Sequence, residues 1–224
     1  MIARILIDQA ETPGGGKELR LYQHDKDFYI IAGSDVLMDS RMHASEETMA
    51  RVATKRISKR KRPRVLIAGL GMGFTLRAAL DGLPATAEVV MAELVPTVVK
   101  WNRGLLGDLA GHPLRDKRVN CREEDAISII KESKKRYDAI LLDVDNGPTG
   151  MFGQSNDWFY RFSGLHAMKA SLEPKGVLAL WSAGPDVTFT ARLNKVGFEV
   201  EEIRCRARPG NKGSHHLIWI ATKR

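Results

Sequence analysis

The segment Val65–Glu93, VLIAGLGMGFTLRAALDGLPATAEVVMAE, decides the fold of this chain. It opens with the short apolar run Val65–Ala68, continues into the glycine-rich stretch Gly69–Gly73 and then shows a helical pattern. The second apolar run, Glu88–Ala92, ends at the acidic residue Glu93. Short apolar strands that alternate with amphipathic helices indicate right-handed βαβ units and a mainly parallel sheet. The segment therefore predicts one strand–loop–helix–strand unit.

The glycine loop has the chemistry of a nucleotide cradle. Gly69, Gly71 and Gly73, with Met72 between the last two, permit positive φ angles and a close backbone approach to a ligand. The helix that follows offers free N–H groups. Glu93 ends the next strand, where a carboxylate can accept hydrogen bonds from both ribose hydroxyls. This spacing predicts a site for the adenosine end of an S-adenosylmethionine-type cofactor; the alternative is a tight turn beside a solvated acid.

Acidic residues also follow two later strands. A carboxylate at Asp125-Ala126 can accept from an adenine amino group, and Asp125 is equally suited to cap a helix. Asp143 follows the apolar run Tyr137–Leu142 and precedes Asp145. Ligands of open α/β sheets lie beyond the carboxyl ends of the strands. We therefore expect these acids to face the reactive end of the cofactor, unless they only cap turns.

The remaining segments complete a larger sheet. Strands are predicted at Arg118–Cys121, Gly176–Trp181, Phe198–Arg206 and His216–Thr222, and one long helix at Trp158–Leu172. Only the loop Pro209–Gly213 separates the last two strands, which suggests an antiparallel hairpin at the sheet edge. We predict an α/β, Rossmann-like fold of the S-adenosylmethionine-dependent methyltransferase type over residues 44–224, with a seven-stranded sheet.

Residues 1–43 are predicted to form a small N-terminal β-domain. Apolar and polar residues mix in four short stretches between turn signals: Ala3–Asp8, Glu18–Gln23, Asp27–Ala32 and Asp35–Met38. This pattern indicates an antiparallel meander. A helix is expected from Ala44 to about Ile57, with Ser45 as its N-cap.

The composition is that of an ordinary globular protein. The chain has 224 residues, of which 43% are hydrophobic and 28% charged, as expected for one main domain with a modest extension. Cys121 and Cys205 match no metal spacing, and we predict no metal site. Met1–Ala10 has too little apolar length for a signal peptide, and no stretch approaches a membrane span. We predict a cytoplasmic protein without a membrane partner.

The chain is basic, with a net charge of +8 and a pI of about 9.6. Such a charge raises the question of a nucleic-acid partner. Much of the excess lies in Lys55–Arg64, KRISKRKRPR. Runs of this kind are usually solvated helix ends or linkers, and we favour that interpretation over nucleic-acid binding.

Together these motifs resemble those of the spermidine synthase (polyamine aminopropyltransferase) family. Ile67–Gly73 resembles its glycine-rich loop, Glu93 its ribose-binding acid and Asp125-Ala126 its adenine-binding pair. The segment YDAILLDVDNGP, Tyr137–Pro148, is similar to the family segment YDVIIxDxxDPxGP and is the most specific match. The resemblance implies a transferase fold behind a small N-terminal β-domain, and a homodimer.

The resemblance also implies a reaction. Family members move an aminopropyl group from decarboxylated S-adenosylmethionine to a small-molecule amine such as putrescine. Asp143 would be the base that accepts the proton of the amine, and Asp145 an acid that holds the amine. The Tyr-His-Glu motif of the family is replaced by Arg41–Glu47, where His43 and Glu46 are expected to stand in as substrate-binding residues.

Two departures from the family pattern keep other functions open. The family loop carries an acid at the position of Met72, where it engages the amine of the decarboxylated cofactor. Met72 lacks such a group, so the first alternative is a methyltransferase that uses S-adenosylmethionine, with RNA as one candidate substrate. The altered motif around His43 suggests a second alternative, a catalytically degenerate synthase fold that serves as a binding module.

Overall fold

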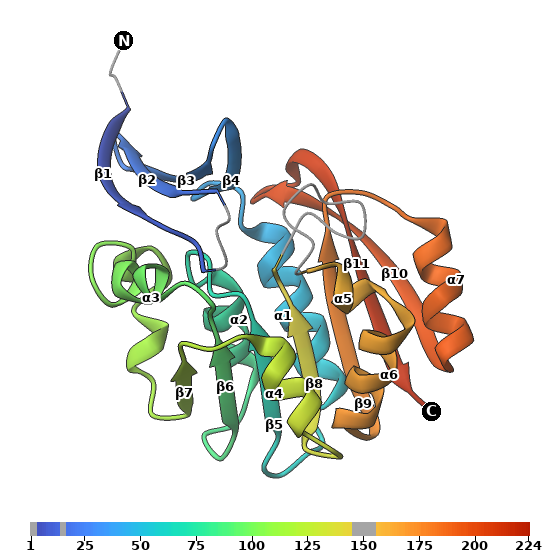
Figure 1. Ribbon diagram of the computed structural model, residues 1–224. Helices are drawn as coiled ribbons and strands as arrows, with labels where there is room; N and C mark the ends of the chain where they lie inside the picture. The colour runs from blue at the N-terminus through green and yellow to red at the C-terminus, as the bar shows by residue number, and fades with distance from the viewer. Residues whose placement is uncertain (1–3, 14–16, 145–155) are drawn as a thin grey trace.

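A small sheet and a large sheet form the framework of the chain in a computed structural model, which describes residues 4–13, 17–144 and 156–224 (Figure 1). The small sheet is antiparallel throughout and has the order β1-β2-β3-β4. Its strands are β1 (Ile5–Ala10), β2 (Leu19–His24), β3 (Asp27–Ala32) and β4 (Asp35–Asp39). The predicted N-terminal meander is confirmed.

The large sheet has seven strands in the order β10-β11-β9-β8-β5-β6-β7. They are β5 (Arg64–Ala68), β6 (Glu88–Ala92), β7 (Val119–Arg122), β8 (Tyr137–Leu142), β9 (Leu172–Ser182), β10 (Phe198–Arg208) and β11 (Lys212–Lys223). Strands β5 to β9 are parallel, whereas β11 runs antiparallel to both β9 and β10. This topology confirms the predicted fold class, including the C-terminal hairpin.

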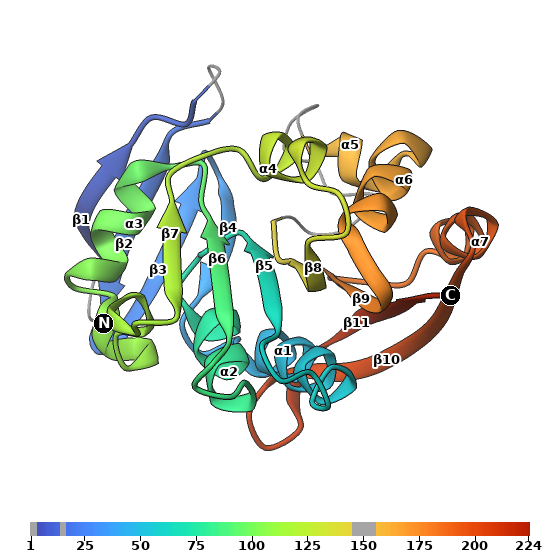
Figure 2. The ribbon, with the colours of Figure 1, turned by 90° about the horizontal axis from the view of Figure 1, so that it is seen from below.

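Helices cover both faces of the large sheet (Figures 1 and 2). One face packs against α1 (Ala44–Arg56), α2 (Phe74–Gly82) and α3 (Pro96–Arg103), and the other against α4 (Ala126–Glu132), α5 (Asp157–Tyr160), α6 (Phe162–Ser171) and α7 (Val187–Val196). Two short 3-10 helices, η1 (Gly107–Ala110) and η2 (Pro113–Arg115), precede β7. Strand β5 shows why two cores form, because Val65 and Ile67 enter one core while Leu66 and Ala68 enter the other.

The helices differ from the sequence predictions in two places. The single helix expected at Trp158–Leu172 is divided into α5 and α6, since Arg161 has extended backbone angles. Helix α7 was not predicted, although its ends follow ordinary rules: Asp186 accepts a hydrogen bond from the Phe189 N–H, and Gly197 ends the helix with a φ of 90°. Within the described residues, no helix has the length and apolar character needed to cross a membrane.

The small sheet shares its core with the main domain. Leu21 and Ile30 belong to the same buried cluster as α1, α2 and α3. The indole Nε1 of Trp101, on α3, donates to Oδ2 of Asp8, on β1, at 2.9 Å. This packing places the small sheet against the helices near the glycine loop (Figure 1). The proposed domain division at residues 43 and 44 stays a prediction.

A close contact joins the ends of β5 and β8. Gly69 has a φ of 89°, and a Cβ atom at this position would lie 2.2 Å from the carbonyl oxygen of Asp143. A real Cβ atom cannot approach backbone so closely, so the position requires glycine for its conformation and for its contact. Gly111 is a useful comparison, because it has a φ of 64° but nothing within 4 Å of its Cβ position.

We predict that Gly69→Ala destabilises the protein by about 1–3 kcal/mol more than Gly111→Ala, because only the first forces the backbone of Asp143 to move. Both variants carry the cost of a left-handed alanine, about 1–2 kcal/mol. Chemical denaturation of both variants measures the difference. Equal losses of unfolding free energy would show that the contact with Asp143 does not constrain the loop.

Candidate active site

The glycine loop connects the carboxyl ends of three neighbouring strands of the large sheet. The Gly69 N–H donates to the Ala92 carbonyl at 2.9 Å, and the Asp143 N–H donates to the Ala68 carbonyl at 2.9 Å. Gly69, Gly71 and Gly73 all have positive φ angles, as the loop chemistry predicts, and Gly73 is the N-cap of α2. The predicted loop residues and Asp143 therefore lie together at the carboxyl ends of β5, β6 and β8.

Glu93 is fixed against this loop. Its Oε2 accepts from the Leu70 N–H at 2.9 Å, and its Oε1 accepts from the Val95 N–H at 2.8 Å. Burial raises the pKa of the Glu93 carboxyl, while the backbone donors at Val95 and Leu70 oppose that rise. The backbone N–H groups of Leu94 and Gly71 also act on this carboxylate and lower its pKa. The Glu93 carboxylate is therefore fixed at the end of β6, beside the glycine loop.

Met72 lies inside the protein. Its side chain is 2% exposed and belongs to the core formed with the small sheet and helices α1 to α3. The small sheet also reaches the loop, because a Cβ at Gly71 would lie 2.8 Å from the Met38 side chain. Asn102 supports the loop from α3 through a 2.8 Å hydrogen bond to the Gly71 carbonyl. The loop is thus a rigid, covered element that offers no charge at position 72.

Two carboxylates meet next to the loop. Asp143 accepts a hydrogen bond from the Thr75 hydroxyl, on the first turn of α2, at 2.6 Å. Burial raises the pKa of the Asp143 carboxyl to about 6, although the bond from Thr75 opposes this rise. On the first turn of α1, burial raises the pKa of Glu46 well above its ordinary value, and the nearby charges of Asp143 and Glu47 add to this effect.

The acid pair has no cation of its own. Among the described residues, neither Glu46 nor Asp143 forms an ion pair with a lysine, arginine or histidine. Buried charges are normally paired, because removing them from water is costly. An unpaired pair of acids therefore favours a ligand that brings positive charge. The sequence named Glu46 and Asp143 as separate candidate site residues, and the structure brings them close enough for their charges to interact.

His43 lies beside the same loop. Its ring stacks on Phe74, the first residue of α2, with 4.4 Å between ring centroids. Its Nδ1 lies 2.7 Å from Oε1 of Glu47, which also pairs with Arg51. The structure thus places His43 at the expected end of the fold but engages its imidazole with Glu47. Its predicted role in substrate binding stays a prediction.

Ser45 was predicted to cap α1, and this prediction is wrong. His43 occupies the N-cap position, and Ser45 is buried within the first turn. The Ser45 hydroxyl instead accepts from the Trp181 indole N–H at 2.9 Å and lies 2.8 Å from Nδ1 of His216. The other ring nitrogen of His216 lies 3.0 Å from the Ser214 hydroxyl.

This chain of hydrogen bonds is satisfied by a neutral imidazole. Burial lowers the pKa of His216, which favours that form. With its proton on Nε2 the ring donates to Ser214 and accepts from Ser45, and with its proton on Nδ1 these roles are exchanged. The Trp181 ring also meets the imidazole edge-on at 4.8 Å. The start of α1, which carries Glu46, is therefore held by the C-terminal hairpin.

Asp125 and Ala126 lie at the same edge of the sheet, after β7. Asp125 caps α4 by accepting from the Ile127 N–H at 2.8 Å, and Ala126 is buried. The capping role is therefore observed, while a contact with adenine stays a prediction. Asp145 lies outside the described residues. Sequence reasoning missed Thr75, although its place two residues after the last loop glycine puts its hydroxyl on the site-facing end of α2.

Comparisons with known sequences agree on one family. The sequence model of the family described as "Spermine/spermidine synthase domain" matches residues 42–191. The chain is similar to a polyamine aminopropyltransferase of Sulfolobus acidocaldarius, with 29% identity over 129 residues, which is 56% of this chain and 40% of that relative. A polyamine aminopropyltransferase of Prochlorococcus marinus is 27% identical over 58% of this chain and 44% of that relative. Each match spans less than half of the curated relative.

Solved structures support the fold. A spermidine synthase in complex with the transition-state analogue AdoDATO superposes with a TM-score of 0.77 at 18% identity, covering 98% of this chain and 74% of that chain. The spermidine synthase of Thermotoga maritima gives a TM-score of 0.76 at 16% identity, with 98% and 72% covered. At such low identity, these likenesses establish the fold.

We predict that Asp143→Asn stabilises the unliganded protein by about 1–3 kcal/mol at about pH 7.5. The folded pKa of about 6 exceeds the ordinary 3.8, so ionisation of Asp143 costs stability as the pH rises through this window. The advantage of the variant should vanish below about pH 4, where both states are protonated. Thermal unfolding across a pH series measures it.

Asp138→Asn is the matched control, because Asp138 lies on β8, the strand that Asp143 follows, but pairs with Arg60 at 3.2 Å and accepts from the Arg64 N–H. It should lose about 1–3 kcal/mol at neutral pH. If Asp143→Asn were destabilising at neutral pH in the same way, Asp143 would be satisfied in the free protein and the unpaired-acid description would be wrong.

Proposed function

Because the chain belongs to the spermine/spermidine synthase family, we propose that it transfers an aminopropyl group from decarboxylated S-adenosylmethionine to a polyamine acceptor. The observation that carries this proposal is the pair of unpaired acids, Glu46 and Asp143, beside the glycine loop. A polyamine is a flexible chain of cations, and this pair has no cationic partner among residues 4–13, 17–144 and 156–224. The family match and the charge of the site thus support the same substrate class.

The cofactor would lie across the carboxyl ends of the parallel strands. In this proposal Glu93 accepts hydrogen bonds from the two ribose hydroxyls, while the backbone of Gly69, Gly71 and Gly73 lies close to the sulfonium end. Asp125 and Ala126, after β7, would receive the adenine. The contacts of Glu93 with Leu70 and Val95 support this assignment, because they fix its carboxylate toward the loop before any ligand arrives.

The acceptor would approach from the side of α1. Its reacting amine must be neutral to act as a nucleophile, and Asp143 would accept the proton. The amine nitrogen then bonds to the carbon next to sulfur, and the electrons of the broken carbon–sulfur bond remain on sulfur as a neutral thioether. Glu46 would hold a second ammonium group of the acceptor, and His43 would line its path. Asp145, the other predicted acid, lies outside the described residues.

A second candidate is a methyltransferase that uses S-adenosylmethionine. The buried, uncharged Met72 favours it, because the loop offers no acid to the amine of a decarboxylated cofactor. The acceptor would then attack the methyl carbon, and the electrons of the broken carbon–sulfur bond would remain on sulfur as a neutral thioether. A catalytically degenerate binding module remains the third candidate, motivated by the altered motif around His43.

We predict that incubation with putrescine and decarboxylated S-adenosylmethionine yields spermidine, detected by mass spectrometry. Asp143→Asn should lower kcat by about 10²–10⁴-fold, since it removes the proton acceptor. Glu199→Gln, an exposed change on β10, is the matched control and should leave activity intact. Transfer of a methyl group from S-adenosylmethionine would establish the second candidate. Full activity of Asp143→Asn would show that another group is the base.

We also propose that the protein is a homodimer formed through the small sheet. Strand β1 is at the edge of this sheet, and its side chains Ile5, Leu6 and Ile7 are 62%, 46% and 39% exposed. An open, apolar edge strand is ordinarily covered by another element or chain. A cytoplasmic location stays a prediction alongside this proposal.

We predict that sedimentation velocity finds twice the chain mass at micromolar concentration. Leu6→Lys should shift the protein toward the monomer, because it places a charge on the exposed edge strand. An exposed lysine elsewhere, at Thr86→Lys, is the control and should leave the mass unchanged. A wild-type protein that sediments as a monomer would contradict the proposal.

A further inference from the structure

Positive charge is concentrated at the edge of the large sheet where the parallel strands begin, opposite the edge where they end and where the candidate active site lies. Strands β5 and β8 begin at this edge, and their carboxyl ends carry the site (Figure 1). Three segments contribute exposed cations here: the last turn of α1 with the loop that leads to β5, the loop between α4 and β8, and the start of β9. We call the following residues the basic edge: Lys55, Lys59, Lys61, Arg62, Lys134, Lys135, Arg136 and Lys175.

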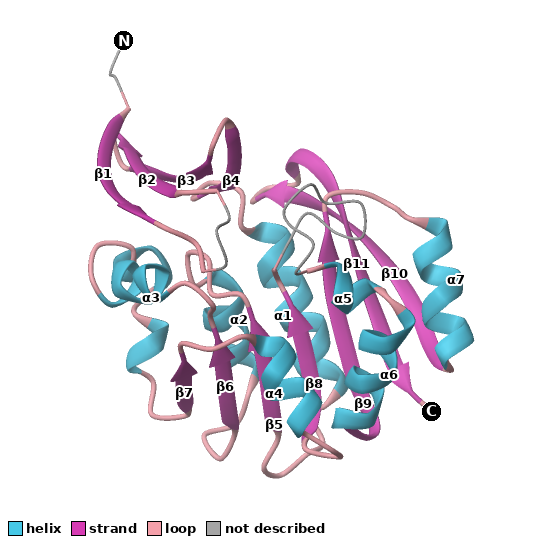
Figure 3. Cartoon of the chain, viewed as in Figure 1, coloured by secondary structure: helices cyan, strands magenta, loops and turns pink. Residues whose placement is uncertain are grey.

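The loop between α1 and β5 is fixed to its neighbours. Arg60 donates to the Pro174 carbonyl at 2.6 Å and lies 3.2 Å from Oδ1 of Asp138. Arg64 pairs with Glu173 at 3.2 Å. The basic run Lys55–Arg64 therefore comprises the end of α1, a loop and the first residue of β5, and it is held against β8 and β9 (Figure 3). Its lysines are exposed, which agrees with the interpretation of the run as a solvated helix end and linker.

The second loop is fixed at the same place. The Lys135 N–H donates to the Ala170 carbonyl at 2.9 Å, and the Arg136 N–H donates to the Ser171 carbonyl at 2.8 Å. These bonds join the loop to the end of α6, which continues directly into β9. The three cationic segments thus form one continuous surface whose backbone is already ordered.

The cations of the basic edge are not neutralised within the protein. In the part of the chain that the structure describes, none of the eight forms an ion pair with an acidic side chain. Two acids of this region, Asp138 and Glu173, are already engaged by Arg60 and Arg64. Unpaired like charges repel one another, and a polyanion relieves that repulsion.

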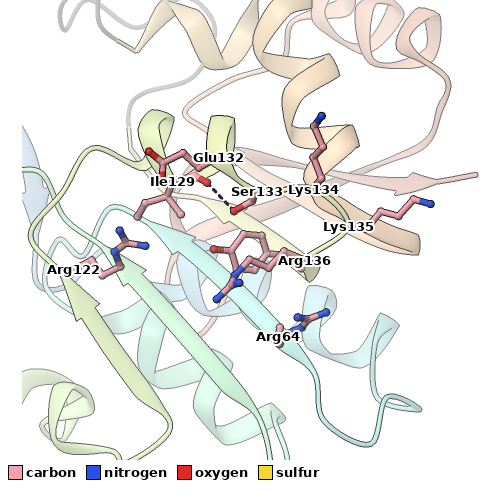
Figure 4. Close-up of a pocket in the computed structure, with 9 residues that line it drawn as sticks. Arg64, Arg122, Ile129, Glu132, Ser133, Lys134, Lys135 and Arg136 are labelled. Atoms are coloured by element: carbon pink, nitrogen blue, oxygen red, sulfur yellow. Dashed lines mark hydrogen bonds between the residues drawn. The ribbon is translucent and has the colours of Figure 1, made fainter.

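A pocket of ≈ 380 Å³ opens within this region, under the C-terminal end of α4. Three arginines and one acid, Glu132, are among the residues that line it. Figure 4 shows the side chains of Arg122 and Arg136 extending toward each other, with Lys134 and Lys135 pointing away. Arg122 is paired with Glu124, whereas Arg136 has no acidic partner in the described residues. An arginine offers a planar set of donors that matches a phosphate group.

We propose that the basic edge binds the phosphodiester backbone of nucleic acid, with the arginine-lined pocket receiving a phosphate. An anionic membrane is the main competitor, but membrane-surface elements combine basic residues with apolar ones that insert. None of the large apolar side chains exposed in the described residues falls in the three segments; they are Ile5, Leu6, Ile7, Val36, Leu94, Leu105, Phe162 and Val187. The surface therefore fits a phosphate chain better than a lipid surface.

This binding does not depend on the proposed transferase reaction. The acids of the candidate active site lie at the other edge of the sheet, so a nucleic acid on the basic edge leaves that site open. The test below measures affinity and salt dependence alone. A failure to bind nucleic acid would leave the transferase proposal intact, and the reverse also holds.

The experiment is fluorescence anisotropy of a labelled single-stranded RNA of about 20 nucleotides with the full chain over a salt series. Each phosphate contact adds about −0.7 to the slope of log affinity against log salt for a single strand. Replacement of Lys59, Lys61 and Arg62 by alanine should weaken binding at least about tenfold and reduce the slope by about 2. Duplex DNA of equal length shows whether the surface prefers one form of backbone.

The matched control removes the same charge elsewhere, by replacing Lys26, Arg204 and Lys212, which are exposed and lie outside the basic edge. It should change affinity less than about threefold. Equal losses in both triple variants would assign binding to net charge and overturn the proposal. Salt-independent binding, or tighter binding to vesicles of phosphatidylcholine and phosphatidylserine than to either nucleic acid, would overturn it as well.

Discussion

The close packing of Gly69 against the Asp143 carbonyl is the contact on which the candidate site depends. It holds the ends of β5 and β8 together, so the glycine loop and the Asp143 side chain occupy fixed relative positions. Thr75 then fixes the carboxylate from the first turn of α2, and Glu93 closes the loop from β6. Backbone geometry that only glycine permits therefore fixes the positions of Asp143 and Glu93.

Glu46, the acid that lies near Asp143, belongs to a different part of the chain. Glu46 lies on α1, and the residue beside it, Ser45, is bonded to Trp181 and close to His216 on the C-terminal strands. The site therefore joins segments that are distant in sequence, and within the described residues its two acids form no ion pair. Burial raises the pKa of both carboxyls, because their negative charges are costly in this site. The positive charges of a polyamine would lower that cost.

Local sequence signals predicted the elements that depend on local rules. Strand β8 was predicted with its observed bounds, because all six residues are buried and the run is flanked by polar residues. The hairpin and the loop glycines followed from spacing in the same way. Ser45 could not be assigned, since its residue type fits an N-cap and its true partners lie more than 130 residues away. The covered position of Met72 likewise depends on the small sheet, which no local pattern reveals.

Calorimetric titration of the folded protein with methylthioadenosine tests the central claim most directly. This ligand contains the adenosine and thioether that the loop, Glu93 and Asp125 are proposed to hold, without the reacting group. The account predicts saturable binding with one ligand per chain, weakened at least about tenfold by Glu93→Gln, because an ionised hydrogen-bond partner of the ribose is lost. No detectable binding by protein whose folded state is verified would contradict the assignment of the glycine loop as an adenosyl site.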